Sequence, residues 1–400
     1  MTLAVLVAAV DALDRHVDAL TSAQLLARPL AALVDAQRQA AGARLLSLEL
    51  PGWFAGILAQ AFVLFYYWRS GGAARWREAL TRRLHSAGAV RFAFGATLAL
   101  LARAAAVIPS FYLWRVDRVM GLSHALTRVW AYEYVLGTAI GMIVAGIIVA
   151  VVLWVVQRTH QWYLYAIAAI VAVSLAGAIL NPFVVAPLFE RYAPVRGALG
   201  ARARAFAGEH GYPTISILVQ RRVDRVPESA ADVQGMGATQ RIVLAQSIVV
   251  TATPGEIDYY VAEAIAELDA HDPLRLALID AAIAVVGIAI AVMVADRIPF
   301  RRDDDPISRT TLVGVLLALV YIPAVLVDHN VVASMRLQSI QRAIAMTGDP
   351  ASALRALVRA GDERVEQVCP SAAGRIFLSR TPSLGQDASA VGSSSGCTNP

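Results

Sequence analysis

The chain has 400 residues, of which 58% are hydrophobic and only 16% are charged, a balance that excludes a soluble enzyme of this length. Its formal net charge is +5 and all of its basic residues are arginine. Basic residues beside membrane spans usually set orientation, so this charge predicts no nucleic-acid partner. The apolar residues come in long runs, and we interpret the chain as an integral membrane protein surrounded by lipid.

The N-terminal segment, residues 1–48, alternates apolar and charged residues. Its charged positions include Asp11, Asp14, Arg15, His16 and Asp18. This pattern predicts a pair of amphipathic helices at the membrane interface, or one more marginal span. No basic region precedes the apolar residues, so the segment is not expected to be a signal peptide.

Six apolar runs are each roughly long enough to cross about 30 Å of hydrocarbon as a helix. They are residues 53–68, 92–114, 134–157, 162–180, 276–295 and 312–327. They predict four transmembrane helices within 49–189 and a transmembrane hairpin at 276–328. Arg103 lies inside the second run and must face other helices or water, so we interpret it as part of a structural ion pair or hydrogen bond.

Two mixed segments, 190–275 and 329–385, interrupt the membrane pattern and predict the two parts of one small α+β domain. In the first part, residues 215–219 and 241–250 are β-branched runs that predict strands. The chain is therefore expected to be mainly α, a polytopic helical membrane protein whose α+β domain is split by the hairpin.

Local signals mark the helix that follows these strands. Thr253, Pro254 and Glu256 form a capping box, which predicts that a helix begins there. Asp272 and Pro273 predict the cap and first residue of the next span.

The end of the chain predicts no fixed structure. Residues 386–400 are rich in serine and glycine and predict a disordered tail. Cys369 and Cys397 are the two cysteines, and their spacing is not that of a metal site.

Five stretches occur in an order that is more specific than any one of them. They are GLS at 121–123, NPFVVAPLFERYAPV at 181–195, VQGMGATQRIVL at 233–244, AHDPLR at 270–275 and TGDPASALRALV at 347–358. This order resembles the type I CAAX prenyl protease family of integral-membrane zinc metallopeptidases, gluzincins related to the HtpX proteases. The resemblance implies a metallopeptidase-like domain that roofs an intramembrane chamber, in a bacterial-type cell membrane.

The family's His-Glu-x-x-His motif falls on Glu263, Ala264 and Glu267. In the family, the two histidines hold zinc and the glutamate is the general base. Ala264 therefore stands at the position of the base, and alanine cannot take a proton from water. The third ligand of the family, a glutamate after the last span, falls on Arg336 or Gln338, and residues 329–348 contain no Asp or Glu.

Two interpretations of the remaining polar residues stay open. Glu263, Glu267 and His271 are spaced four residues apart, so they share a helix face and could hold a metal. The interpretation we favour is that the glutamates are solvated or paired with arginine, since no fourth donor is apparent. The charges of the two helices are reversed relative to the family, which predicts that Glu263 and Glu267 pair with Arg336 and Arg342 in place of zinc.

These residues predict a pseudo-metallopeptidase with no catalytic residues and no cofactor, which binds or regulates a membrane-embedded or lipidated peptide or protein. One alternative is an active zinc-dependent metalloendopeptidase of the CAAX type with a rearranged metal site. Another is a transporter-like or structural membrane protein, to which Arg103 and Glu133 would matter. For orientation, the arginine count places the soluble domain outside, whereas the resemblance implies the cytoplasm.

Overall fold

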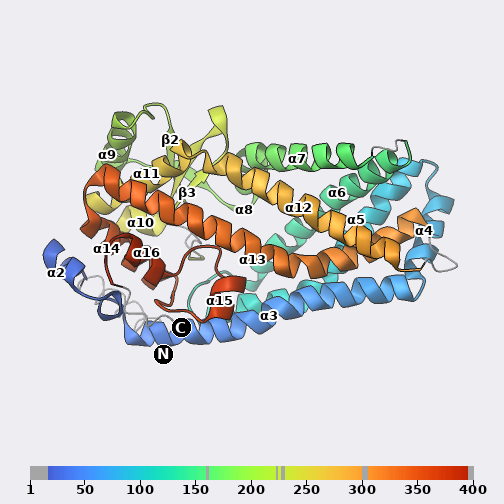
Figure 1. Cartoon of the computed structure of the whole chain (residues 1–400), viewed down its shortest axis with the longest axis horizontal. Coiled ribbons are helices and arrows are strands. Elements are labelled where there is room, and N and C mark those ends of the chain that lie inside the picture. Colours follow the sequence, from blue (N-terminus) through green and yellow to red (C-terminus); the bar gives the residue numbers. More distant parts are fainter. Residues whose placement is uncertain (1–16, 159–161, 222–223, 227–229, 300–304, 395–400) are drawn as a thin grey trace.

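Six long helices form the body of the computed structural model, which describes residues 17–158, 162–221, 224–226, 230–299 and 305–394. They are α3 (Ala36–Arg69), α5 (Ala87–Val119), α6 (Thr127–Val156), α7 (Trp162–Leu180, continued to Phe189), α12 (Asp272–Arg297) and α13 (Pro306–Thr347). Each is long and apolar enough to cross a membrane, and most run along the long axis of the molecule (Figure 1). The six predicted spans are confirmed, and the chain is a polytopic α-helical membrane protein.

Helices α5 and α6 approach each other closely at glycines. A Cβ added at Gly95 would lie 2.7 Å from the carbonyl oxygen of Ala145, and one added at Gly146 would lie 2.8 Å from the ring of Phe92. Small residues let membrane helices pack with their backbones in contact, where dispersion rather than water exclusion stabilises the pair. The two glycines therefore set the spacing of α5 and α6.

Gly146→Ala is expected to destabilise the protein by about 1 to 3 kcal/mol, because the added methyl group forces the two helices apart. The measurement is the midpoint of thermal unfolding in detergent. Gly141→Ala is the matched control, since it lies on the same helix and a Cβ there meets nothing within 4 Å. Equal midpoints for the two variants would contradict the prediction.

A four-stranded sheet lies at one end of the bundle, in the order β1-β2-β4-β3. The strands are β1 (Tyr192–Pro194), β2 (Ser216–Gln220), β3 (Ala231–Gln234) and β4 (Arg241–Ala245); β2 and β4 are parallel and the other pairs antiparallel. The predicted strand at 241–250 is wrong beyond Ala245, because α10 (Gln246–Thr251) follows at once. Its β-branched Ile248 favoured a strand from the sequence, but as part of a helix it is fully buried in the core.

Helix α11 (Pro254–Asp269) crosses the sheet domain and is buried on nearly all sides. Its predicted capping box is confirmed, since the backbone N–H of Thr253 donates to Glu256 Oε2 at 2.6 Å. The buried Glu256 also pairs with Arg359 of α14 (Pro350–Glu363) at 3.3 Å. The local signal at the start of α11 thus also fixes this helix against α14.

The described N-terminal residues before α3 pack into the core of the sheet domain. Helix α2 (Ser22–Ala27) contacts α14, and Leu25, Leu30 and Leu33 belong to the main buried core. The predicted amphipathic pair is therefore wrong for residues 17–35, whereas residues 36–48 are the first part of α3, so the boundary at 48 falls inside that helix. Residues 1–16, with Asp11, Asp14, Arg15 and His16, lie outside the described residues.

The other predicted domain boundaries also fall inside helices. The boundary at 275 lies within α12 and the one at 328 lies within α13, so the spans continue directly into the domain. The remaining helices are η1 (Leu30–Ala32), α4 (Gly72–Arg83), η2 (Asn181–Val185), α8 (Ala186–Phe189), α9 (Gly197–Glu209), η3 (Gly237–Thr239), α15 (Ala372–Phe377) and α16 (Leu384–Ala390).

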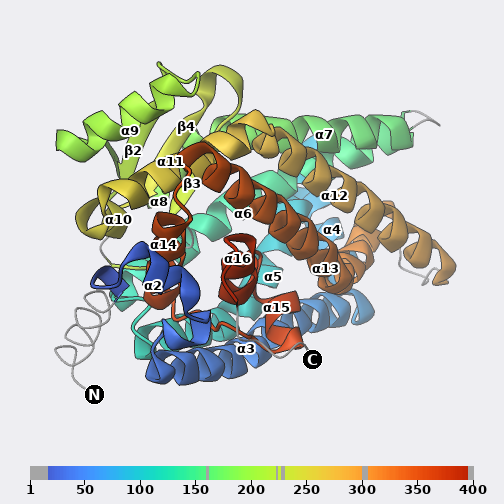
Figure 2. The same cartoon turned by 60° about the vertical axis from the view of Figure 1, so that its left-hand side comes forward.

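The predicted disordered tail is wrong for residues 386–394. Leu384, Ala388 and Val391 bury one face of α16 in the core. Figures 1 and 2 both show α15 and α16 lying between α13 and α3. Residues 395–400, with Cys397, lie outside the described residues.

Candidate functional site

The motif positions lie in the middle of α11, where it packs against α13. Glu263 is 4% exposed and Ala264 is 2% exposed. From α13, Arg336 places Nη2 3.4 Å from Glu263 Oε1, and both side chains are largely buried. The structure therefore brings together Glu263 and Arg336, one of the pairings that the reversed charges predict.

The other residues of the predicted site are not joined in the same way. Glu267 is partly buried and lines a cavity beside the pair, and its burial, with the nearby charge of Glu263, raises its pKa well above the usual range. Arg342 is exposed, and its charge acts on Asp272.

His271 does not share the helix face of the two glutamates. Helix α11 ends at Asp269, and His271 is the N-cap of α12, with a left-handed φ of 56°. Its Nδ1 lies 3.1 Å from the carbonyl oxygen of Leu268. The predicted arrangement of Glu263, Glu267 and His271 along one face is wrong, because the chain turns between the two helices; the predicted cap, Asp272, is instead the first helical residue.

Two buried residues that the sequence did not single out complete the surroundings of Arg336. Tyr259 is fully buried on α11, and Asp387 of α16 is 2% exposed. Charge interactions connect both of them to Arg336. Among the described residues, the Tyr259 hydroxyl and Asp387 Oδ1 have no hydrogen-bond partner. The spacing of Leu384, Ala388 and Val391, by four and then three residues, is the helical signal that could have placed Asp387 on a buried helix.

Asp387→Asn is expected to flatten the dependence of stability on pH. Burial raises the pKa of Asp387 to about 8, against the opposing effect of the Arg336 charge, whereas an aspartate in an unfolded chain has a pKa of about 3.9. Because the pKa is raised in the folded state, protonated Asp387 contributes its full stabilisation when the pH is below the pKa of the unfolded chain. This contribution is lost as the pH rises toward 8. Asparagine resembles the protonated form, so the variant's advantage in unfolding temperature should grow from pH 4 to pH 8. An advantage that shrinks over that range would contradict the prediction.

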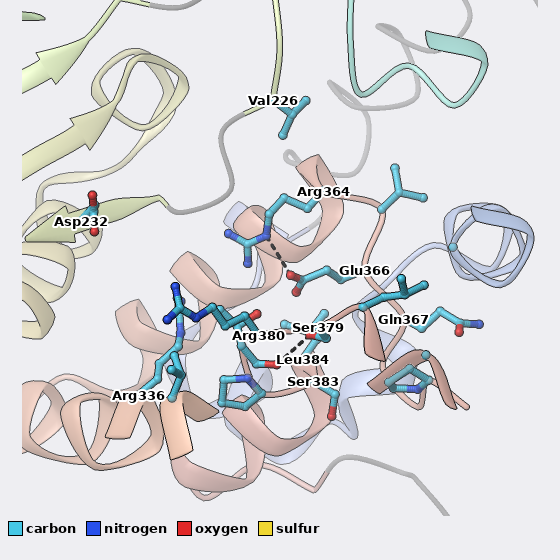
Figure 3. Close-up of a pocket in the computed structure, with 18 of the residues that line it drawn as sticks. Val226, Asp232, Arg336, Arg364, Glu366, Gln367, Ser379, Arg380, Ser383 and Leu384 are labelled. Carbon is cyan, nitrogen blue, oxygen red and sulfur yellow. Dashed lines mark hydrogen bonds and ion pairs between the residues drawn. The ribbon is translucent and has the colours of Figure 1, made fainter. Parts of the chain in front are cut away.

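A cavity of about 650 Å³ lies beside the Glu263–Arg336 pair. Its walls come from α3, α12, α13, the edge strand β3 and the chain from Arg364 to Leu384. Figure 3 shows Asp232 of β3 across the cavity from Arg380, Ser383 and Leu384. The cavity therefore lies where the sheet domain meets the membrane helices.

Ion pairs lie in and around the cavity wall. Arg225 pairs with Glu133 of α6 at 3.1 Å, and Arg364 pairs with Glu366 at 2.8 Å (Figure 3). Glu133, which the transporter-like alternative invoked, is thus part of a contact between the domain and α6. Arg103 lies farther along the bundle, with its guanidinium 4.4 Å from the ring centre of Tyr134, in agreement with a structural role.

The residues at the motif positions do not fit a zinc site. Zinc in such enzymes needs nitrogen, oxygen or sulfur ligands about 2 Å away and an open position for water. In the part of the chain that the structure describes, no group of three or more His, Cys, Asp or Glu is placed to hold a metal. The position facing Glu263 belongs to Arg336, whose positive charge repels a cation.

Known proteins resemble this chain in two respects, the sequence of its membrane helices and its overall fold. A family model described as the N-terminal region of the CAAX prenyl proteases, with five membrane helices, matches residues 54–191. The uncharacterized metalloprotease YhfN of Bacillus subtilis (strain 168) is 26% identical over 133 residues, which cover 33% of this chain and 31% of YhfN. The match thus spans about a third of that relative's length.

A solved structure extends the likeness to nearly the whole chain at the level of the fold. The crystal structure of S. mikatae Ste24p superposes with a TM-score of 0.58 at 13% identity, covering 87% of this chain and 98% of Ste24p. The family model and the sequence match relate this chain to the CAAX prenyl proteases and to membrane metalloproteases, and the Ste24p structure shows that it shares their fold.

Proposed function

We propose that this chain is a pseudo-metallopeptidase, a catalytically degenerate member of its family that binds a membrane peptide or protein instead of cleaving it. The observation that carries the proposal is the pair formed by Glu263 and Arg336 beside Ala264. Alanine provides no general base, and an arginine takes the place of a metal ligand. Glu263 and Arg336, at positions where the family binds its metal, therefore form an ion pair with each other.

We further propose that this pair replaces a metal as the link between α11 and α13. A zinc ion would join two helices through ligands of both, and an ion pair of opposite charges can do the same. Both side chains are largely buried, so each charge requires the other. The arrangement supports a structural role for the motif positions.

The cavity is the part of the structure that supports binding. Its volume of about 650 Å³ lies in the usual range of ligand sites. Leu45, Leu276 and Met335 offer apolar contacts in its wall, beside charged groups such as Glu267 and Arg364. This mixture suits a membrane-embedded or lipidated peptide or protein, and we expect the protein to lie in the cell membrane, with no nucleic-acid partner.

The deciding experiment measures metal content and peptidase activity together on the purified full chain in detergent. A fluorescent farnesylated peptide that ends in a CAAX sequence serves as both substrate and binding probe. We expect far less than one zinc per chain, no chelator-sensitive cleavage and saturable binding of the peptide. Stoichiometric zinc with chelator-sensitive cleavage would instead select an active metalloendopeptidase, and solute flux in liposomes would select a transporter.

A matched pair of variants on α12 ties the binding to the cavity. Leu276→Trp fills part of the cavity, whereas Leu274→Trp lies on the exposed surface of the same helix. Only Leu276→Trp is expected to weaken binding of the farnesylated peptide. Equal weakening by both variants, or by neither, would show that the peptide binds elsewhere.

A further inference from the structure

The C-terminal chain forms one side of the cavity and lies between two membrane helices. Residues 378–384 all line the cavity, and α15 and α16 lie on either side of them, between α13 and α3 (Figures 1 and 2). A ligand that enters the cavity from this side must pass residues 371–383, which precede the buried part of α16 and which we name the strap.

The strap is held at both ends by hydrogen bonds to the N-terminal part of the chain. Before it, Gln39 donates to the carbonyl oxygen of Glu366 at 2.9 Å and accepts from the N–H of Val368 at 2.8 Å. After it, the N–H of Leu30 donates to the carbonyl oxygen of Ser394 at 2.9 Å. The strap is thus anchored at one end to the first turns of α3 and, beyond α16, to η1.

Between these anchors, the strap meets the membrane helices through side chains. The ring of Phe377 lies 5.7 Å from that of Trp53 and 5.2 Å from that of Phe54 on α3. His329 of α13 lies 2.9 Å from the carbonyl oxygen of Ile376. A segment held by a few side-chain contacts opens at a lower free-energy cost than the long helices around it.

Arg380 makes the charged contact of the strap. It pairs with Asp328 of α13 at 3.0 Å and with Asp280 of α12 at 3.6 Å. Carboxylates within membrane spans are costly unless a cation neutralises them, so Arg380 stabilises two helices at once. The Arg380 side chain is half exposed, and such a pair is weak enough to open.

We propose that the strap fills the binding site of the partner until the partner displaces it. The ion pairs of Arg380 with Asp280 and Asp328 are the latch that holds the strap in place. This proposal rests on the proposed binding function and names the chemistry of the partner. A partner that replaces the strap presents an apolar group to Trp53 and Phe54 and, about three residues further on, a cation to the two carboxylates. A partner binds only those molecules in which the strap has moved away, so its apparent affinity is reduced in proportion to the fraction of molecules in that open state. Weakening the ion pairs of Arg380 raises this fraction and therefore strengthens binding.

The test compares how fast a water-soluble maleimide modifies a cysteine in the cavity wall. Met335→Cys is the reporter, because Met335 lines the cavity and is 6% exposed, and the chain without this change reports any reaction of its own cysteines. Arg380→Gln is expected to speed labelling about two- to fivefold, because the loss of an exposed ion pair shifts the opening equilibrium of the strap by about that factor. Arg375→Gln is the matched control, since Arg375 is exposed on the same strap and forms no ion pair within the described residues.

A charge exchange distinguishes the latch from a general disturbance. Arg380→Asp combined with Asp328→Arg restores an opposite pair, so labelling is expected to return toward the rate of the unaltered strap. The farnesylated peptide is expected to bind Arg380→Gln more tightly than Arg375→Gln, by a factor close to the increase in labelling.

The outcomes separate the strap from the proposed function. If Arg380→Gln labels no faster than Arg375→Gln, the strap is overturned, whatever the peptide does. If the peptide binds neither variant, the proposed function is overturned, whatever the labelling rates are. Hydrogen exchange on the unaltered chain requires no variant to fold: amides of residues 371–383 are expected to exchange before those of α13, and exchange only with global unfolding would overturn the strap.

Discussion

Arg336→Glu is expected to lower the free energy of unfolding by about 3 to 5 kcal/mol, the usual cost of removing one partner of a buried ion pair. The change places a third carboxylate beside Glu263 and Asp387, where the guanidinium of Arg336 now lies. The loss should appear as a large fall in the unfolding temperature of the purified protein in detergent.

Exchange of the two charges is expected to recover part of this loss. Glu263→Arg with Arg336→Glu restores opposite signs between α11 and α13, so the double variant should be more stable than either single variant. Arg342→Glu is the matched control, because Arg342 is exposed on the same helix, and surface changes of this kind usually alter stability by about 0.5 kcal/mol or less. A double variant that is no more stable than its singles would disprove the link between the helices.

Zinc is expected to bind tightly only after four positions are changed together. Glu263→His, Ala264→Glu and Glu267→His restore the motif of the family on α11, but Arg336 still faces residue 263 with a positive charge. Adding Arg336→Glu removes that charge and supplies a third ligand. Glutamate is a shorter side chain than arginine, but a zinc ion that lies about 2 Å from each ligand atom fills part of the gap that the shorter side chain leaves.

The measurement is zinc per chain after purification and dialysis. The four-fold variant is expected to carry about one zinc per chain, as expected for ligand sets of this kind, and the three-fold variant far less. Gln338→Glu in place of Arg336→Glu is the control, since residue 338 was the other candidate for the third ligand from the sequence. Equal zinc in the two four-fold variants would show that Arg336 is not the deciding position.

The sequence could place the elements whose signals are local. The six spans follow from the length of apolar runs, because crossing hydrocarbon requires that length and little else. The capping box at Thr253 follows from hydrogen bonds within one turn. The motif positions on α11 follow from the resemblance to the family's motif, whose spacing lies within a single helix.

The sequence misled where tertiary contacts outweighed local preference. Ile248 lies in a β-branched run, yet it is buried in the short helix α10. The serine and glycine content of residues 386–400 suggested disorder, yet Ala388 and Val391 pack in the core. In both cases the burial of a few apolar side chains against distant elements decided the local structure.

By itself, the sequence determined that this is a six-span membrane protein, and it has Glu263, Ala264 and Glu267 at the positions that the resemblance assigns to the zinc ligands and the base. Only the tertiary structure decided which charges meet. It joined Glu263 to Arg336 but left Arg342 at the surface, and from the C-terminal chain it brought Asp387 close to Arg336 and Arg380 to the cavity. The reason is that ion pairs act through space over a few ångströms, and the packing of α11, α13 and the strap sets those distances.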